Sequence, residues 1–256
     1  MADCRDVLYR SLEASIERCG GRLDEVKVLE TARHFDSDRQ PKAYDDTTNP
    51  GENAVRLVCC PHSAEAARTC FAAAQDIMSC VPPEAMIHVN TEQSMHVTLF
   101  HTSHPHDRRP FSPAIRTQEL TTLRDMAAAF PSFTLSFHSI IVASSGSIIM
   151  LFDDPHDTVH RLRHEAHATF PSLPASQTTT IVHTTLARLM SPSISADSLV
   201  TVQDKCRVVT ARLRREAFTV LLSSLWYVEE THYFSAGSGP RTSIPLPPPV
   251  LHVPEA

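Results

Sequence analysis

The sequence of 256 residues is 42% apolar and has a formal charge of −6, which predicts a packed core and leaves no broad basic surface for a long nucleic acid. Seven cysteines lack the spacing of a disulfide framework or a zinc ribbon, so the expected environment is reducing, the cytoplasm or the nucleus. The first 21 residues lack the apolar stretch of a signal peptide, and no apolar run approaches the roughly 18 residues that span a bilayer.

The N-terminal part of the chain predicts one helix followed by a loop. Apolar residues recur there every four positions, which is the spacing of an amphipathic helix, at Cys4, Leu8, Leu12 and Ile16. Gly20-Gly21 ends this helix. Residues 33–52 are polar and rich in aspartate, so we expect a mobile loop there. Residues 1–52 therefore form a predicted unit of helix and loop.

The middle of the chain, residues 53–235, mixes predicted strands with predicted helices. The expected strands are Ala54–Cys60, Met95–His101, Phe133–Ala143, Ser147–Phe152, Thr180–Leu189 and Thr219–Glu229. The expected helices follow Ser63, surround Leu120–Met126, cover 157–169, and run through Leu199–Leu213 behind a Ser195 cap. A proline-rich tail, residues 236–256, is predicted to be extended and disordered.

Two of the expected strands carry the same short motif. The first reads Met95-His-Val-Thr-Leu-Phe100 and the second reads Val182-His-Thr-Thr-Leu-Ala-Arg188, with their histidines 87 positions apart. Residues i and i+2 of a strand share a face, so His96 and Thr98 face the same way, and so do His183 and Thr185. Val97 and Leu99 are expected to face the core behind the first motif, and Val182 and Leu186 behind the second. If the two strands are neighbours, two imidazoles and two hydroxyls meet in one cleft.

These four groups suit a phosphodiester. One neutral imidazole can accept a proton from the attacking oxygen, and the other, as imidazolium, can donate a proton to the leaving oxygen. The threonine hydroxyls can hydrogen-bond the non-bridging oxygens. This chemistry requires no metal or other cofactor. The sequence does not say which of His96 and His183 is the base.

The motifs His96-Val-Thr-Leu and His183-Thr-Thr-Leu-Ala-Arg resemble the two signatures of the two-histidine (2H) phosphoesterase superfamily. Its members include bacterial RNA 2′,3′-cyclic phosphodiesterases (once called 2′-5′ RNA ligases), plant and yeast cyclic phosphodiesterases, and the enzymes that trim U6 RNA. The resemblance covers about residues 54–234. It implies an α/β (α+β) fold in which two pseudo-symmetric lobes, each a sheet with helices, surround a central cleft.

The resemblance also implies a function. His96 and His183 would be catalytic, Thr98 and Thr185 would bind the substrate phosphate, and no metal would be needed. The expected protein is a metal-independent phosphodiesterase acting on a 2′,3′-cyclic nucleotide or an RNA end. Its expected partner is this small substrate, with no membrane or long duplex nucleic acid, and we expect a monomer. The first 50 residues and the histidine-rich loop 101–106 have no counterpart in the resemblance.

Three alternatives stay open. The chain could be a nucleotide-binding or RNA-end-binding module of the same fold that has lost turnover. It could be a zinc hydrolase built on the loop histidines His101, His104 and His106. The motif histidines could also be ordinary residues at the edge of the core, with threonines that favour strand structure.

Several other residues are candidates for a role at or near the site. Strict alternation places Arg188 opposite His183 unless the strand ends at Ala187, so phosphate binding and a surface role are both open for it. Four histidines at helical spacing are expected to form a solvated face: His156, His160, His164 and His167. The candidate aromatic residues for stacking a base are Phe152, Tyr227, Tyr233 and Phe234.

Overall fold

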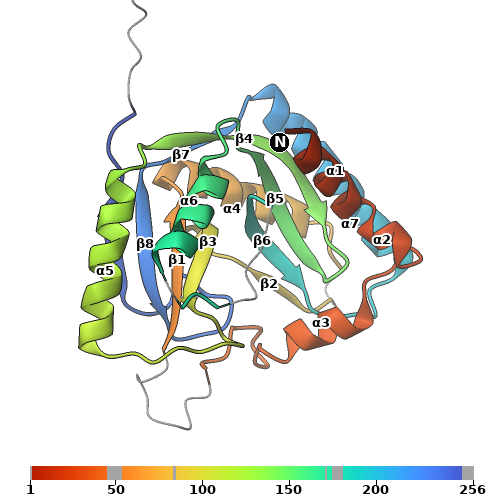
Figure 1. Ribbon diagram of the computed structural model, residues 1–256. Helices are drawn as coiled ribbons and strands as arrows, with labels where there is room; N and C mark the ends of the chain where they lie inside the picture. The colour runs from red at the N-terminus through yellow and green to blue at the C-terminus, as the bar shows by residue number, and fades with distance from the viewer. Residues whose placement is uncertain (1, 45–53, 83–84, 171, 175–180, 250–256) are drawn as a thin grey trace, which may run out of the picture.

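Two antiparallel sheets form the centre of the molecule in this computed structural model, which describes residues 2–44, 54–82, 85–170, 172–174 and 181–249 (Figure 1). The four-stranded sheet has the order β3-β1-β8-β9, and the five-stranded sheet has the order β2-β6-β5-β4-β7. The strands are β1 Val55–Pro61, β2 Ile87–Val89, β3 His96–Ser103, β4 Phe133–Val142, β5 Ser147–Asp153, β6 His183–Leu189, β7 Thr219–Leu222, β8 Ser224–Glu230 and β9 Arg241–Pro245.

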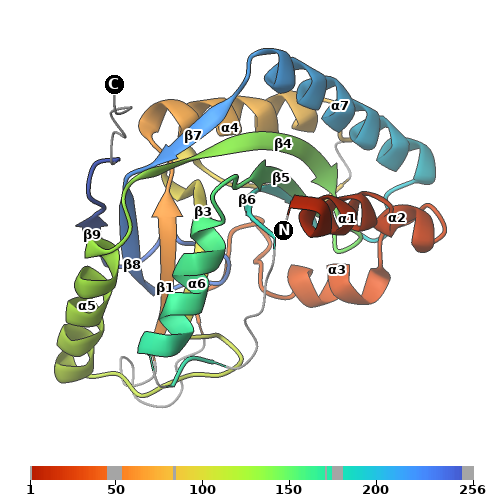
Figure 2. The same ribbon diagram turned by 45° about the horizontal axis from the view of Figure 1, so that its top comes forward.

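Helices cover the outer faces of both sheets (Figure 2). The helices are α1 Ala2–Glu13, α2 Ser15–Arg18, α3 Glu25–Ala32, α4 Ala64–Met78, the 3-10 turn η1 Glu92–Ser94, α5 Pro113–Ala128, α6 Thr158–Thr169 and α7 Ala196–Arg215. Helices α4 and α7 contact each other and the five-stranded sheet, while α5 and α6 contact strands of the four-stranded sheet. The fold class and the bilobal arrangement expected from the sequence are confirmed.

Short-range signals explain where several helices begin. The side chains of Ser63, Ser112 and Ser195 each accept a hydrogen bond from a backbone N–H in the first turn of α4, α5 and α7. Such a cap satisfies a donor that has no partner within the helix, and it contributes about 1 kcal/mol. The predicted caps at Ser63 and Ser195 are therefore confirmed. No helix in the described ranges is both long enough and apolar enough to cross a membrane.

The residues behind the two motifs belong to the main core. Val97, Leu99, Val182 and Leu186 are at most 2% exposed and join one cluster that extends between the sheets and the helices. Full burial of a side chain of this size contributes about 1.5–3 kcal/mol. Because these residues are held in the core, the alternate residues of both strands must face away from it. In both strands, the buried apolar residues thus fix the orientation of the motif histidine and threonine.

The C-terminal part differs from the expectation in two places. The expected strand Thr219–Glu229 is divided at Ser223, so β7 joins the five-stranded sheet and β8 joins the four-stranded sheet. In the tail predicted to be disordered, residues 241–245 form β9, which pairs with β8. Ile244 and Leu246 are buried there, so alternating apolar residues outweigh the nearby prolines. Residues 250–256 lie outside the described part.

The N-terminal segment packs against both sheets. The Tyr9 hydroxyl donates to the carbonyl of Phe152 (2.8 Å) and accepts from the backbone N–H of Val182 (3.1 Å), which fixes α1 to the five-stranded sheet. Helix α3 was not predicted. Within the loop predicted to be mobile, Phe35 is 5% exposed and the backbone of Ala43 bridges to the 231–236 loop. Residues 45–52 lie outside the described part, and the domain boundaries stay a prediction.

Candidate active site

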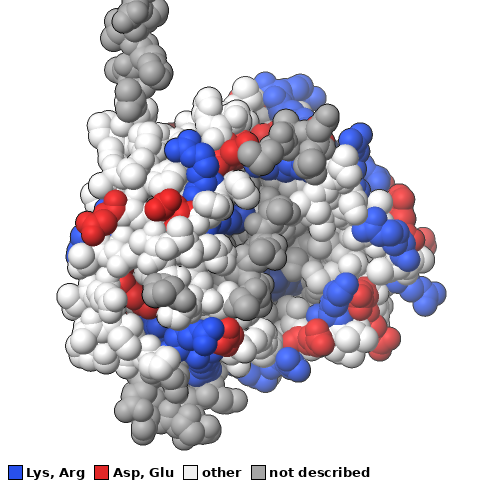
Figure 3. All heavy atoms as spheres, in the orientation of Figure 1, with Lys and Arg blue, Asp and Glu red and all other residues white. Residues whose placement is uncertain are grey.

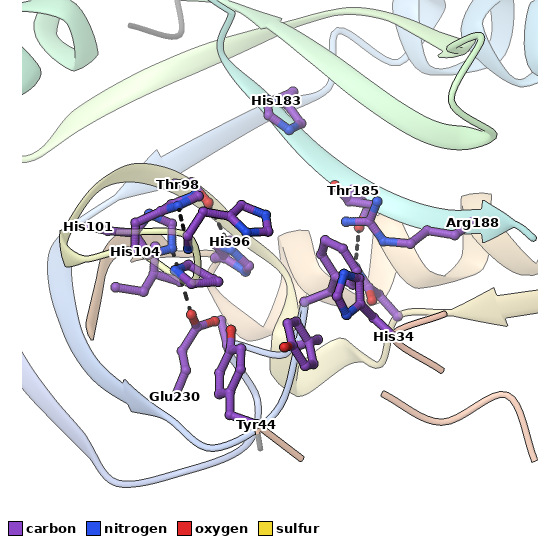
Figure 4. Close-up of a pocket in the computed structure, with 17 residues that line it drawn as sticks. His34, Tyr44, His96, Thr98, His101, His104, His183, Thr185, Arg188 and Glu230 are labelled. Atoms are coloured by element: carbon purple, nitrogen blue, oxygen red, sulfur yellow. Dashed lines mark hydrogen bonds and ion pairs between the residues drawn. The ribbon is translucent and has the colours of Figure 1, made fainter. Parts of the chain in front are cut away.

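A pocket of about 220 Å³ lies where the two motif strands meet. His96 and Thr98 line it from β3, and His183 and Thr185 line it from β6 (Figure 4). The strands come from different sheets, yet β3 and β6 are in contact. The four residues that the sequence singles out therefore share one cavity, and two of them come from each lobe.

Strand β3 contains a β-bulge one residue after its threonine. Thr98 and Phe100 pair with consecutive residues of β1, so Leu99 has no partner in that ladder. A bulge shifts the alternation of side chains by one residue. Leu99 and Phe100 are both buried as a result, and His101 lines the pocket together with Thr98. In a regular strand His101 would point to the opposite face.

Strand β6 contains a bulge at the equivalent place. Thr185 and Ala187 pair with consecutive residues of β5, and Leu186 between them is left out of the ladder. Arg188 therefore lines the pocket on the same face as His183 and Thr185. The prediction that strict alternation places Arg188 opposite His183 is wrong, because the strand is not regular. The bulges lie 87 positions apart, the same separation as the two motif histidines.

The imidazole of His96 is held in one orientation. Its Nδ1 lies 2.6 Å from the carbonyl oxygen of Ser94, so Nδ1 carries the proton that is donated there. Nε2 lies 3.2 Å from the Thr98 hydroxyl. Burial lowers the pKa of His96 below its usual range, while the Ser94 carbonyl and the Glu230 carboxylate act in the opposite direction. The protein thus fixes the tautomer of this ring.

His183 stands in a different environment. Burial, together with the charges of Arg163, His96 and Arg188, lowers the pKa of His183 to about 3. Its Nδ1 is buried and has no hydrogen-bond partner among the described residues. Because no described group fixes its tautomer, the ring is held neutral without a preferred donor atom. The two motif histidines are therefore alike in sequence and unlike in electrostatics.

A chain of hydrogen bonds joins the lobes directly behind the site. The Thr184 hydroxyl donates to the backbone carbonyl of His96 (2.9 Å). His62 Nε2 lies 2.7 Å from the same hydroxyl, and donates to it, since the hydroxyl proton is already used. Burial lowers the pKa of His62 to about 3. This neutral histidine supports the contact between β3 and β6.

Aromatic side chains form a further part of the pocket lining. His34 stacks on Tyr233 with ring centroids 3.9 Å apart, and Tyr44 contacts Tyr233 at 4.3 Å. Phe234 lies beneath the guanidinium of Arg188, 4.3 Å from its carbon. All of these residues line the pocket. Of the aromatic residues proposed from the sequence, Tyr233 and Phe234 are confirmed as pocket residues.

The sequence did not identify His34 and Tyr44, which reach the pocket from the N-terminal segment. No motif marks them, because their position depends on how that segment folds back over the lobes. Phe152 and Tyr227, by contrast, are fully buried and do not line the pocket. They are therefore excluded as stacking residues by their place in the core.

One carboxylate also faces the pocket. Glu230 is 8% exposed, and its Oε2 lies 3.7 Å from His101 Nε2. Burial and the neighbouring imidazoles of His101 and His106 lower the pKa of His104 to about 4. Anionic and titratable groups therefore occupy the β3 side, whereas Arg188 brings a permanent cation from the β6 side.

Comparisons with known proteins add information about the fold. No protein-family profile matches the sequence, and no curated protein matches it. Among solved structures, a conserved protein of unknown function from Agrobacterium tumefaciens strain C58 is similar with a TM-score of 0.50 and 16% identity, over 81% of this chain and 96% of that one. The chain shares the fold of this structure, with two antiparallel sheets and helices around them.

Two further structures align with lower scores. Usb1 of Kluyveromyces marxianus with uridine monophosphate has a TM-score of 0.48 and 11% identity, over 76% of this chain and 99% of that one. LigT of E. coli complexed with 3′-AMP has a TM-score of 0.45 and 14% identity, over 76% of this chain and 96% of that one. A shared fold does not assign an activity, because activity depends on the residues of the site.

The remaining histidines that the sequence singles out form two groups, one on the surface at and just before α6 and one in the loop beside the pocket. His156, His160, His164 and His167 are all exposed, as predicted for a solvated face. In the loop after β3, the rings of His101, His104 and His106 lie 5.0 and 5.4 Å apart between consecutive centroids. A metal site needs several side-chain donor atoms close together. In the described part of the chain, three such atoms lie within 4.8 Å of one another in Asp6, His138 and Asp153, which are outside the pocket.

The charge distribution fits a small ligand. Figure 3 shows basic and acidic residues mixed over the visible face, with no continuous basic field among the residues drawn in colour. Recognition of a long nucleic acid backbone generally uses such a field. Arg188 instead brings a cationic group into the pocket itself.

Proposed function

We propose that this protein is a metal-independent phosphodiesterase that hydrolyses a 2′,3′-cyclic nucleotide or the corresponding cyclic phosphate at an RNA end. One observation carries the proposal: the imidazoles of His96 and His183, the hydroxyls of Thr98 and Thr185, and the guanidinium of Arg188 line one small pocket. Two imidazoles can supply the base and the acid for attack of water at phosphorus.

The electrostatic difference between the histidines supports separate roles. Burial, together with the charges of Arg163, His96 and Arg188, lowers the pKa of His183 to about 3, so this ring is neutral at physiological pH and is the proposed base that removes a proton from the attacking water. His96 retains a hydrogen bond from Nδ1 to Ser94 and a nearby carboxylate, both of which favour its protonated form. His96 is therefore the proposed acid, which donates a proton through Nε2 to the leaving ribose oxygen.

The remaining polar groups suit the phosphate. The hydroxyls of Thr98 and Thr185, which line the pocket, are proposed to donate to its non-bridging oxygens, and Arg188 is proposed to balance their negative charge. The guanidinium is held between Ser147, to which its Nη1 donates at 2.9 Å, and the ring of Phe234. A cation fixed in this way does not lose orientation when the substrate binds.

The aromatic wall suits the base of the nucleotide. Tyr44 and Tyr233, with His34 stacked on the latter, offer flat apolar surface in the same pocket as the groups proposed to bind phosphate. Stacking of one base on an aromatic side chain contributes about 1–3 kcal/mol. The pocket, with a volume of about 220 Å³, suits one nucleotide unit better than a nucleic acid double helix. The substrate is therefore proposed to present a single terminal nucleotide.

The decisive experiment is mass spectrometry of products from a panel of 2′,3′-cyclic nucleotides, 3′,5′-cyclic nucleotides and short RNAs with cyclic ends, in the presence of EDTA. We expect a nucleoside 2′- or 3′-monophosphate from the 2′,3′-cyclic substrates. Isothermal titration calorimetry with the same panel shows binding without product if the protein is a binding module. Activity that appears only when zinc is restored would contradict the metal-independent mechanism.

A further inference from the structure

The two bulges leave backbone carbonyls that the strand ladders do not satisfy. A bulge places two residues opposite one, so the extra residue lacks its ladder partner. A buried carbonyl without a donor is costly and is seldom left unpaired. The structure supplies a donor group at each bulge, and the two groups come from unrelated elements.

At the β3 bulge the donor group is Arg163 of α6. Its Nη2 donates to the carbonyl of Thr98 (2.7 Å) and its Nε donates to the carbonyl of Leu99 (3.1 Å). Its Nη1 also donates to the carbonyl of Ile181, just before β6 (3.0 Å). Strand β3 is an edge strand, and α6 lies beside it (Figure 1). The guanidinium thus takes the place of a missing neighbouring strand.

At the β6 bulge the donor group is Asn90, directly after β2. Its side-chain Nδ2 donates to the carbonyl of Thr185 (2.7 Å), and its backbone N–H donates to the carbonyl of Leu186 (2.9 Å). Asn90 is 7% exposed. The same two backbone positions are therefore held in both strands: the carbonyl of the threonine and the carbonyl of the leucine that follows it.

We propose that Asn90 and Arg163 are positioning residues, which hold the two bulges and so keep Arg188 and His101 directed into the pocket. The inference rests on the proposed function for its kinetic test. Without the bulge, the residue five positions after each motif histidine would turn to the opposite face. By holding the bulges, Asn90 affects substrate binding through the position of Arg188, and Arg163 affects it through the position of His101.

A double-mutant cycle tests the Asn90 part. Asn90→Ala removes the side-chain donor and retains the backbone N–H. With a 2′,3′-cyclic nucleotide as substrate, we expect Arg188→Met to raise KM about 10- to 100-fold and Asn90→Ala to raise KM about 5- to 10-fold. In the Arg188→Met background, Asn90→Ala should add less than about twofold, because the group that it positions is already absent.

A matched control separates positioning from general stability. The Thr210 hydroxyl accepts a hydrogen bond from the backbone of Ile140 (2.9 Å) outside the pocket, so Thr210→Val removes a buried hydrogen bond and should leave KM unchanged. An equal rise of KM on Asn90→Ala in both backgrounds would overturn the proposal. An unchanged KM despite a lower melting temperature would overturn it as well.

A second double-mutant cycle, with Arg163 and His101, tests the proposed role of Arg163. Arg163→Lys retains the charge but has no planar fork to reach the three carbonyls together. We expect a rise of KM that disappears in the His101→Gln background. A persistent rise would show that Arg163 does not act through His101.

A final readout does not depend on turnover. Calorimetry with a nucleoside 2′-monophosphate measures the same cycles as affinities. If Arg188→Met leaves the affinity unchanged, the proposed phosphate site fails. If Arg188→Met weakens binding and Asn90→Ala does not, the proposed function stands and the positioning role fails.

Discussion

The two motif strands, β3 and β6, share a backbone design and differ in their electrostatics. Each places a histidine, a threonine and, after a bulge, a third polar residue on one side of the pocket. The third residue is His101 in β3, close to Glu230, and Arg188 in β6. Equivalent positions thus carry a titratable group in one lobe and a permanent cation in the other.

This difference explains how a pseudo-symmetric site can perform an asymmetric reaction. Acid–base catalysis needs one histidine with a proton and one without. Burial disfavours a proton on His183, and the positive charges of Arg163, His96 and Arg188 add to this effect. Burial also lowers the pKa of His96, but the carbonyl of Ser94 and the carboxylate of Glu230 act in the opposite direction. Under the proposed function, the two lobes would therefore give different tasks to the same residue type.

The largest expected effects come from removing either catalytic group. His96→Ala and His183→Ala should each lower kcat about 10²- to 10⁴-fold, the usual contribution of one general acid or base. Steady-state hydrolysis of a 2′,3′-cyclic nucleotide measures this effect. His160→Ala, an exposed histidine on α6, is the control and should retain full activity. Full activity in either motif variant would remove that histidine from the mechanism.

The residues that follow the two bulges, Arg188 and His101, should give the next largest effects on activity. Arg188→Met should raise KM about 10- to 100-fold, since a charged hydrogen bond to phosphate contributes about 1.5–3 kcal/mol. His101→Gln should raise KM less than Arg188→Met does, because Arg188 brings a permanent cation to the pocket whereas His101 lies beside the Glu230 carboxylate. KM of both variants for a 2′,3′-cyclic nucleotide checks this difference. An equal rise of KM in both variants would contradict the assigned asymmetry.

The threonines should show smaller and similar effects. Thr98→Val and Thr185→Val keep the shape of the side chain and remove one neutral hydrogen bond, which contributes about 0.5–1.5 kcal/mol. We expect a fall in kcat/KM of about 2- to 12-fold for each. The double variant should lose about the product of the two factors if both hydroxyls contact the phosphate independently. No loss in either single variant would exclude phosphate contacts by these hydroxyls.

The smallest expected effect is a displacement of the pH profile. Loss of activity at low pH reports protonation of the base, and the pKa of His183 is lowered by burial and, in part, by Arg188. Arg188 also lowers the pKa of His96. Arg188→Met removes that positive charge, so the pKa values of both histidines rise and both limbs of kcat/KM move to higher pH. His101 lowers the pKa of His96 and is not among the groups that act on His183. His101→Gln should therefore move the basic limb to higher pH and leave the acidic limb in place.

Much of the local structure could be predicted from the sequence. Met95 and Val97 flank His96, and Val182 and Leu186 lie behind the second motif, so these apolar residues place both histidines away from the core, and the structure has this arrangement. Capping serines and alternating apolar residues likewise predict most helices and strands. These signals depend on neighbours a few residues apart, so the sequence carries them directly.

Tertiary structure alone decided which further residues reach the pocket. A bulge depends on the register between two strands and on donors such as Asn90 and Arg163, which lie 95 and 65 positions from the carbonyls of Thr185 and Thr98 that they hold. Alternation within one strand therefore predicted the wrong face for Arg188. His34 reaches the site for a similar reason, because the N-terminal segment folds over lobes that form from later residues. The motifs and their orientation are local properties, whereas the complete site is a product of long-range pairing.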